Sequence, residues 1–179
     1  MKEKHLTYFK ILDAFSTKEC PLCFLINETV KKYFDDLLYE KVNDPGFRKR
    51  FCKDYGFCRF HSYKFLSYHD GLAVALTHRD LLIELIGALK KRKVKSQPVE
   101  KKECLICTLA KEAQERYIST FINFLAEEEF RNRFLLSEGF CVPHLKRVLN
   151  AAPFPLEWMI NFHLKIYSCL LYTSDAADE

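Results

Sequence analysis

Apolar residues recur along the chain with the spacing of amphipathic helices. Between Pro21 and Val42 they return every three or four positions, which is the period of a helix with one buried face. These positions are Ile26, Val30, Tyr33, Phe34, Leu37 and Leu38. No segment alternates apolar and polar residues over the length that is typical of a β-strand. The pattern therefore predicts an all-α protein.

Proline and aspartate indicate where the helices begin. Pro21 suits a first helical turn, and Asp44 followed by Pro45 is typical of an N-cap and the first helical residue. Asp70 can cap a longer helix that runs to Ala88. A short helix is expected to begin at Pro45 and end near Gly56, and another short one to begin around Cys58. In the second half we expect helices over residues 105–127 and 128–137, followed by one that begins at Pro143 and one that begins at Pro155.

The helical order occurs twice because the chain contains an internal repeat. Lys18-Glu19-Cys20-x-x-Cys23 aligns with Lys102-Glu103-Cys104-x-x-Cys107, and Gly56-Phe57-Cys58-x-x-His61 aligns with Gly139-Phe140-Cys141-x-x-His144. The alignment has 16 identities over about 48 positions with one gap. We interpret it as a duplication, which predicts a duplicated helical bundle with an internal pseudo-twofold repeat.

The repeat also predicts the domain organisation. Residues 1–92 form the first repeat with an N-terminal helix, 93–101 form a polar linker that contains Pro98, and 102–168 form the second repeat. Residues 169–179 resemble the conceptual translation of a transposase sequencing adapter. We therefore expect this tail to be non-native, Cys169 to have no function, and the second repeat to be truncated at its C-terminus.

Composition excludes several classes of protein. Of the 179 residues, 49% are apolar or aromatic, which is too many for a disordered chain. The longest apolar stretch, 71–89, contains His78, Arg79, Asp80 and Glu84, so no transmembrane segment is expected. No apolar signal region follows the N-terminus. We expect a cytoplasmic protein, in which the eight cysteines favour metal or thiol chemistry over disulfides.

The cysteines and histidines of the repeat form two sets of metal ligands. Each repeat offers Cys-x-x-Cys and, further along, Cys-x-x-His, and residues three apart at a helix start share one face. Three thiolates and one imidazole are a closed tetrahedral set for structural zinc. The sequence predicts two zinc ions bound by Cys20, Cys23, Cys58, His61, Cys104, Cys107, Cys141 and His144. Whether one site takes its ligands from one repeat or from both stays open.

Other chemistries remain as alternatives. An iron–sulfur cluster could use the same cysteines, as could a thiol redox centre. Covalent haem is excluded because Phe24 and Thr108 stand where its histidine is required. The chain has no phosphate loop, dinucleotide fingerprint, His-Glu-x-x-His or nucleophile elbow. We name no catalytic residue and expect a binding or regulatory module with an unknown protein partner rather than an enzyme.

Nucleic-acid binding is a minor alternative. The formal net charge is +4, and it becomes +7 when the three acids of the tail are left out. A basic run follows Leu89, but such a run beside a linker is usually solvated. The distance between the cysteine pairs is also too long for a zinc finger that reads base triplets. The charge alone does not favour this function.

Several residues outside the two ligand sets invite simpler explanations. Cys52 has no counterpart in the second repeat, and we expect it to pack as a small apolar side chain. We expect surface or packing roles for His5, His69, His78 and His163. The repeated Phe-Arg-x-Arg-Phe elements at 47–51 and 130–134 could place arginines beside thiolates. An amphipathic helix with phenylalanines inward and arginines solvated or paired with acids is the favoured interpretation.

The doubled Cys-x-x-Cys and Gly-Phe-Cys-x-x-His arrangement, with Asn43-Asp44-Pro45 between its parts, resembles a bacterial family of unknown function. The resemblance covers about residues 17–150. It implies a cytoplasmic bacterial protein whose relatives continue beyond Ser168. It implies no activity.

Overall fold

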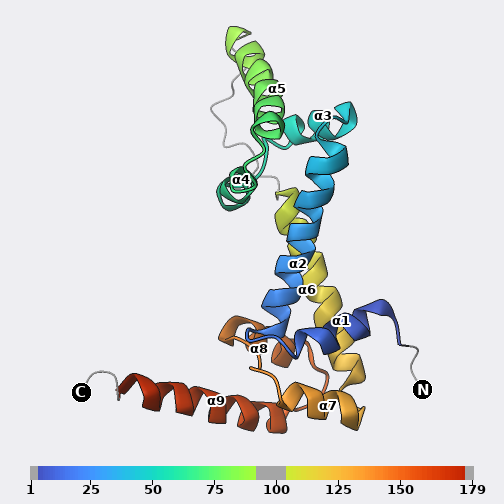
Figure 1. Ribbon diagram of the computed structural model, residues 1–179, viewed down its shortest axis with the longest axis vertical. Helices are drawn as coiled ribbons and strands as arrows, with labels where there is room; N and C mark the ends of the chain where they lie inside the picture. The colour runs from blue at the N-terminus through green and yellow to red at the C-terminus, as the bar shows by residue number, and fades with distance from the viewer. Residues whose placement is uncertain (1–3, 92–103, 176–179) are drawn as a thin grey trace. The chain divides into compact units, whose positions relative to one another are not determined.

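The protein is helical throughout the part that the computed structural model describes, residues 4–91 and 104–175 (Figure 1). No strand occurs in these residues, so the all-α prediction is confirmed. The helices are α1 Leu6–Ala14, α2 Pro21–Asp36, the π-helix η1 Leu37–Lys41, α3 Pro45–Lys53, α4 Arg59–Leu66, α5 Gly71–Lys90, α6 Leu105–Phe124, α7 Glu128–Leu135, α8 Val142–Ala151 and α9 Glu157–Asp175.

The predicted N-caps are present where the sequence placed them. The carboxylate of Asp44 accepts hydrogen bonds from the backbone N–H groups of Gly46 (2.8 Å) and Phe47 (3.2 Å). The carboxylate of Asp70 accepts one from Ala73 (2.9 Å). These bonds satisfy backbone donors that have no partner within the first helical turn. They account for the starts of α3 and α5.

The helix expected over residues 21–42 changes its geometry near the end. It is α-helical only to Asp36, and the next turn is the π-helix η1, which closes with a hydrogen bond from the Val42 N–H to the Leu37 carbonyl (2.9 Å). Leu37 and Val42 lie five residues apart and are both buried. The wider turn lets both side chains face the core, which an α-helical turn would not allow.

The described chain divides into two compact units. Unit 1 consists of residues 1–28 and 112–179, and unit 2 of residues 29–111. The divisions fall inside α2 and α6, so each of these helices contributes one end to each unit. The predicted linker 93–101 lies outside the described residues, as do residues 176–179 of the predicted tail. Residues 169–175 continue α9.

Aromatic side chains form most of the core of unit 1. Phe134 of α7 is fully buried and lies at the centre, because its ring is 4.9 Å from Phe121, 4.8 Å from Phe140 and 5.4 Å from Phe15, measured between ring centroids. Edge-on and tilted aromatic pairs at such distances add to the gain from burial alone. The same core holds the start of α2, because Leu22 and Leu25 are buried in it. Helix α1 packs against α7.

The core of unit 2 is a second aromatic cluster. Phe57 lies 5.7 Å from Phe34, 4.9 Å from Phe51 and 5.7 Å from Phe65 between ring centroids. Helix α3 packs against α5 (Figure 1). The start of α6 belongs to this core, because Ile106 and Cys104, which precedes the helix, are buried in it. Among the described helices, none combines the length and the apolar character that crossing a bilayer requires.

The Phe-Arg-x-Arg-Phe elements follow the amphipathic interpretation. Their four phenylalanines are buried. Arg48 forms an ion pair with Asp80 at 3.4 Å, and Arg133 forms one with Glu129 at 3.4 Å. One arginine of each element, Arg48 and Arg133, is therefore paired with an acidic side chain. The elements serve the cores of the two units.

Candidate metal centres

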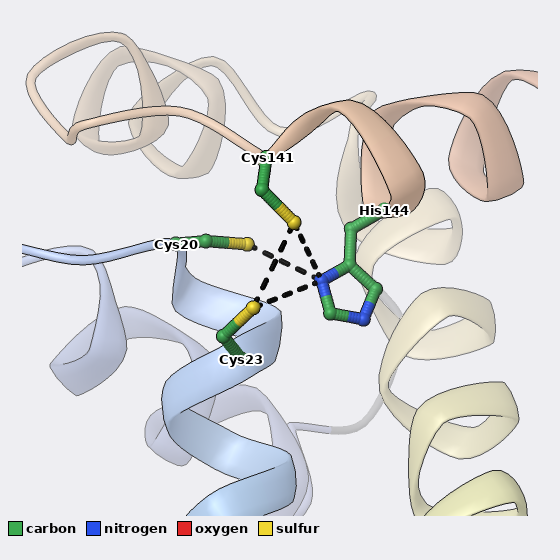
Figure 2. Close-up of side chains that lie close together, drawn as sticks. All are labelled: Cys20, Cys23, Cys141 and His144. Carbon is green, nitrogen blue, oxygen red and sulfur yellow. Dashed lines mark hydrogen bonds between the residues drawn. The ribbon is translucent and has the colours of Figure 1, made fainter.

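Two helix starts bring together the first set of ligands in unit 1. Cys20 immediately precedes α2 and Cys23 lies in its first turn, while Cys141 caps α8 and His144 lies in its first turn. Each cysteine carbonyl accepts the first hydrogen bond of its helix, at 3.0 Å for Cys20 and 2.9 Å for Cys141. The three-residue spacing therefore places both side chains of each pair on one face. Figure 2 shows the four side chains pointing toward one another. We call this set centre 1.

The atoms of centre 1 lie at the corners of a small tetrahedron. The Nδ1 atom of His144 is 3.4 Å from Cys20 Sγ, 3.3 Å from Cys23 Sγ and 3.2 Å from Cys141 Sγ. The sulfur atoms of Cys23 and Cys141 are 3.7 Å apart. All four donor atoms lie within 4.8 Å of one another. Cys20 and His144 are 124 residues apart in the chain.

Unit 2 holds an equivalent set, which we call centre 2. Cys58 is the N-cap residue of α4 and His61 lies in its first turn, while Cys104 immediately precedes α6 and Cys107 lies in its first turn. The Nδ1 atom of His61 is 3.3 Å from Cys58 Sγ, 3.4 Å from Cys107 Sγ and 3.7 Å from Cys104 Sγ. The sulfur atoms of Cys58 and Cys107 are 3.7 Å apart. Both centres therefore combine a Cys-x-x-Cys pair with a Cys-x-x-His pair from a distant part of the chain.

These separations fit a single tetrahedral ion. With Zn–S bonds of about 2.3 Å and Zn–N bonds of about 2.05 Å, tetrahedral geometry separates two sulfurs by about 3.8 Å and a sulfur from a nitrogen by about 3.6 Å. The sulfur pairs at 3.7 Å match this value, and the sulfur–nitrogen pairs at 3.2–3.7 Å lie near it. The two clusters are thus compatible with two bound metal ions.

Burial and neighbouring thiols favour the protonated form of two of the cysteines, Cys107 and Cys23. Burial, together with the neighbouring Cys58 and Cys104, raises the pKa of the Cys107 thiol to about 12. Burial and the neighbouring Cys20 and Cys141 likewise raise the pKa of Cys23 well above its ordinary value. Thiolates that crowd in this way repel one another unless a cation lies between them. A metal ion at either centre would relieve this repulsion.

The two histidines are suited to act as neutral ligands. Burial lowers the pKa of His144, and the nearby Arg147 lowers it further. Burial and then Lys64 lower the pKa of His61 in the same way. A neutral imidazole keeps a lone pair on one ring nitrogen, and in both centres Nδ1 is the ring nitrogen that faces the sulfur atoms. Metal ligation requires this neutral form.

His163, which the sequence analysis did not single out as functional, is hydrogen-bonded to the backbone beside Cys141 of centre 1. His163 of α9 is only 1% exposed. Its Nε2 accepts a hydrogen bond from the Phe140 N–H (2.8 Å), and its Nδ1–H donates to the Met159 carbonyl (2.8 Å). The hydroxyl of Tyr167 donates to the Phe140 carbonyl (2.8 Å). The backbone N–H and the carbonyl of Phe140, the residue before Cys141, are therefore both hydrogen-bonded to side chains of α9.

His78 of α5 makes a contact equivalent to one of His163, and this pair is a sequence signal that could have pointed to His163. Nδ1 of His78 lies 2.8 Å from the Val74 carbonyl, four residues earlier, as Nδ1 of His163 lies from Met159. The two histidines correspond when the repeat alignment is shifted by two residues after the Cys-x-x-His pairs. The sequence comparison without that shift left both histidines without a counterpart.

The remaining candidate residues lie away from the two centres. Cys52 is half-buried on α3 and belongs to neither cluster, so it is less enclosed than the sequence predicted. Cys169 is exposed on α9, and His5 and His69 are exposed. The structure therefore brings together the eight predicted ligands and none of the other described cysteines and histidines.

Comparisons with known proteins show a family but no activity. The profile of a family of unknown function, DUF6062, matches residues 1–160. The chain is similar to an uncharacterised 23.9 kDa protein from the xynA 3′ region of Caldicellulosiruptor sp. strain Rt8B.4. The two are 32% identical over 148 residues, which cover 78% of this chain and 70% of that protein. No solved structure matches the chain.

Proposed function

The chain belongs to the family of unknown function DUF6062, and we propose that it is a zinc-stabilised helical binding module. In this proposal, centre 1 and centre 2 each hold one structural zinc ion through three thiolates and one imidazole. The observation that carries the proposal is the matching pair of clusters, each with three sulfur donors and one nitrogen donor within 4.8 Å of one another. In this proposal the ions fix the starts of α2, α4, α6 and α8.

A single ion suits the geometry better than an iron–sulfur cluster. Inorganic sulfides and more than one iron lie between the protein ligands of a cluster, so ligands on different irons are held further apart than ligands on one ion. Four donors that all lie within 4.8 Å leave no room for such a core. This separation supports a mononuclear centre.

A disulfide-based redox centre receives less support. A disulfide bond is about 2.05 Å long, and the sulfur pairs at 3.7 Å join different motifs, Cys23 with Cys141 and Cys58 with Cys107. No disulfide joins any two cysteines in the part of the chain that the structure describes. Thiols from two different motifs at this separation are better placed to bind one shared metal ion than to form a disulfide.

A structural role follows from the complete ligand set. Catalytic zinc keeps one position open for water or substrate, whereas four protein ligands close the coordination shell. An ion with three thiolates has a net charge of −1, and the partial positive charge of helix N-termini favours it. We propose that both centres arose from one ancestral centre by duplication, with a Cys-x-x-Cys pair from one copy and a Cys-x-x-His pair from the other.

Metal analysis of the purified chain tests the proposal. Inductively coupled plasma mass spectrometry and native mass spectrometry should find two zinc ions per chain, and the protein should be colourless. Cys20→Ser should remove one ion, whereas the matched change Cys52→Ser, at a cysteine outside both clusters, should remove none. Iron with acid-labile sulfide would support the cluster alternative, and an absence of bound metal would overturn the proposal.

A further inference from the structure

Helices α4 and α8 hold their metal ligands in the same way but differ on their outer faces. Each begins after a cysteine and carries its histidine ligand three residues later. The second and fifth residues after the cysteine are Phe60 and Tyr63 in α4, but Pro143 and Lys146 in α8. The metal ligands therefore do not require aromatic residues at these two positions. Phe60 and Tyr63 need another explanation.

The two aromatic residues of α4 are exposed, and their three-residue spacing places them on one side of the helix. Phe60 is 70% exposed and Tyr63 is 64% exposed, whereas Phe65 on the opposite face fills the core. Side chains three residues apart on a helix are neighbours on its surface. The Phe60 ring packs edge-on against the ligand His61, with centroids 5.1 Å apart, so one ring edge is held while the rest stays open to solvent. Phe60 and Tyr63 therefore present two exposed rings on one side of α4.

Positive charge accompanies these rings. Arg59 and Lys64 lie next to them in the sequence of α4, and Arg59 is exposed. The unit that contains α4 is basic as a whole. Unit 2 has 18 Lys and Arg residues against 10 Asp and Glu, whereas unit 1 has 10 against 14. The chain's net positive charge therefore lies in unit 2, since unit 1 has 10 Lys and Arg against 11 Asp and Glu when the tail 169–179 is left out.

We propose that the outer face of α4, formed by Arg59, Phe60, Tyr63 and Lys64, binds single-stranded nucleic acid. Unpaired bases stack on Phe60 and Tyr63, and the phosphates contact the two cationic side chains. Such binding combines sequence-tolerant stacking with electrostatic attraction to the backbone. A duplex buries its base faces and could use only the charges. The proposal rests on the proposed function in one respect, since centre 2 anchors α4.

Fluorescence anisotropy with the metal-loaded full chain tests this proposal. The probe is a fluorescein-labelled oligouridylate of about 15 nucleotides, a length that matches typical site sizes. Phe60→Ala and Tyr63→Ala should each weaken binding roughly 5-fold or more, given the usual contribution of one stacked base. Phe60→Trp should retain binding because it keeps a stacking surface. Affinity should fall as salt increases from about 50 to about 200 mM.

Tyr39→Ala provides the matched control. Tyr39 is 85% exposed in the same unit but belongs to η1, so its loss should leave oligouridylate binding unchanged. An equal loss in Tyr39→Ala would overturn the proposal. So would equal affinity for a duplex of the same length, displacement of the probe by poly-L-glutamate at the same charge concentration, or no salt-dependent binding. Metal content measured on the same samples reports on the proposed function separately.

Discussion

The imidazole of His163 accepts a hydrogen bond from the backbone N–H of Phe140, with 2.8 Å between Nε2 and the nitrogen. Phe140 immediately precedes the ligand Cys141, and its side chain is buried. The bond therefore links α9 to the loop that positions one thiol of centre 1. A buried N–H without a partner destabilises the fold, so His163 also satisfies a group that no water can reach.

His163→Phe should weaken metal binding at centre 1. The phenyl ring keeps the aromatic contacts but removes both nitrogen atoms, so the Phe140 N–H loses its acceptor and the loop before Cys141 loses its anchor. Loss of a group that orients a metal ligand typically reduces affinity about 10-fold to 100-fold. Competition with a chromophoric chelator should show one weakened ion and one unchanged ion per chain. Equal weakening of both ions would argue against a local role.

Metal stoichiometry in double variants should reveal which cysteines share an ion. Cys20 and Cys141 belong to one cluster, and Cys104 belongs to the other. We expect Cys20→Ser with Cys141→Ser to leave one ion per chain, as either single change does. Cys20→Ser with Cys104→Ser should leave none. If each centre instead took its ligands from neighbouring motifs, Cys20→Ser with Cys141→Ser would remove both ions, so elemental analysis of this variant distinguishes the two arrangements, whereas Cys20→Ser with Cys104→Ser removes both ions in either case.

The eight residues of the two clusters could be singled out from the sequence, but their grouping could not. The pairs Cys20 with Cys23 and Cys141 with His144 are local, because a three-residue spacing at a helix start places both side chains on one face. The meeting of Cys20 with His144 spans 124 residues and depends on how α2 and α8 pack in the core of unit 1. Helical periodicity contains no information about such distant packing.

The helices themselves were predictable to within a few residues because their signals are local. Asp44 and Asp70 cap the helices that the sequence assigned to them. The π-helical turn at Leu37–Lys41 was not predicted, since it follows from the burial of two side chains five residues apart rather than from the propensity of any one residue. The role of His163 was missed for a similar reason, because its partner is a backbone group 23 residues away.

Removal of metal should unfold α4 and α8 before the longer helices. These helices have 8 and 10 residues, and isolated helices shorter than about 12 residues are barely stable in water. Each has only two buried side chains, and one of them is the ligand histidine. Hydrogen exchange with a chelator present should therefore lose protection first at 59–66 and 142–151. A uniform loss that includes α6, with its 20 residues, would contradict this order.

Gly139→Ala should destabilise unit 1 and disturb centre 1 together. The φ angle of Gly139 is +69°, a conformation that costs a residue with a side chain about 1–2 kcal/mol. A Cβ atom there would lie 3.0 Å from Nε2 of His163, so it would press on the residue that holds Phe140. We expect a lower free energy of unfolding and weaker binding of one metal ion, measured by denaturant titration and chelator competition.

Gly87→Ala is the matched control for this change. Gly87 lies inside α5, and a Cβ atom built there meets no atom within 4 Å. Alanine stabilises a helix interior by up to about 1 kcal/mol relative to glycine, so the same substitution should here raise the free energy of unfolding. Neither metal ion should change its affinity, because Gly87 is in neither cluster. If both alanine variants shifted stability in the same direction, the strain and the contact with His163 would not explain why position 139 is glycine.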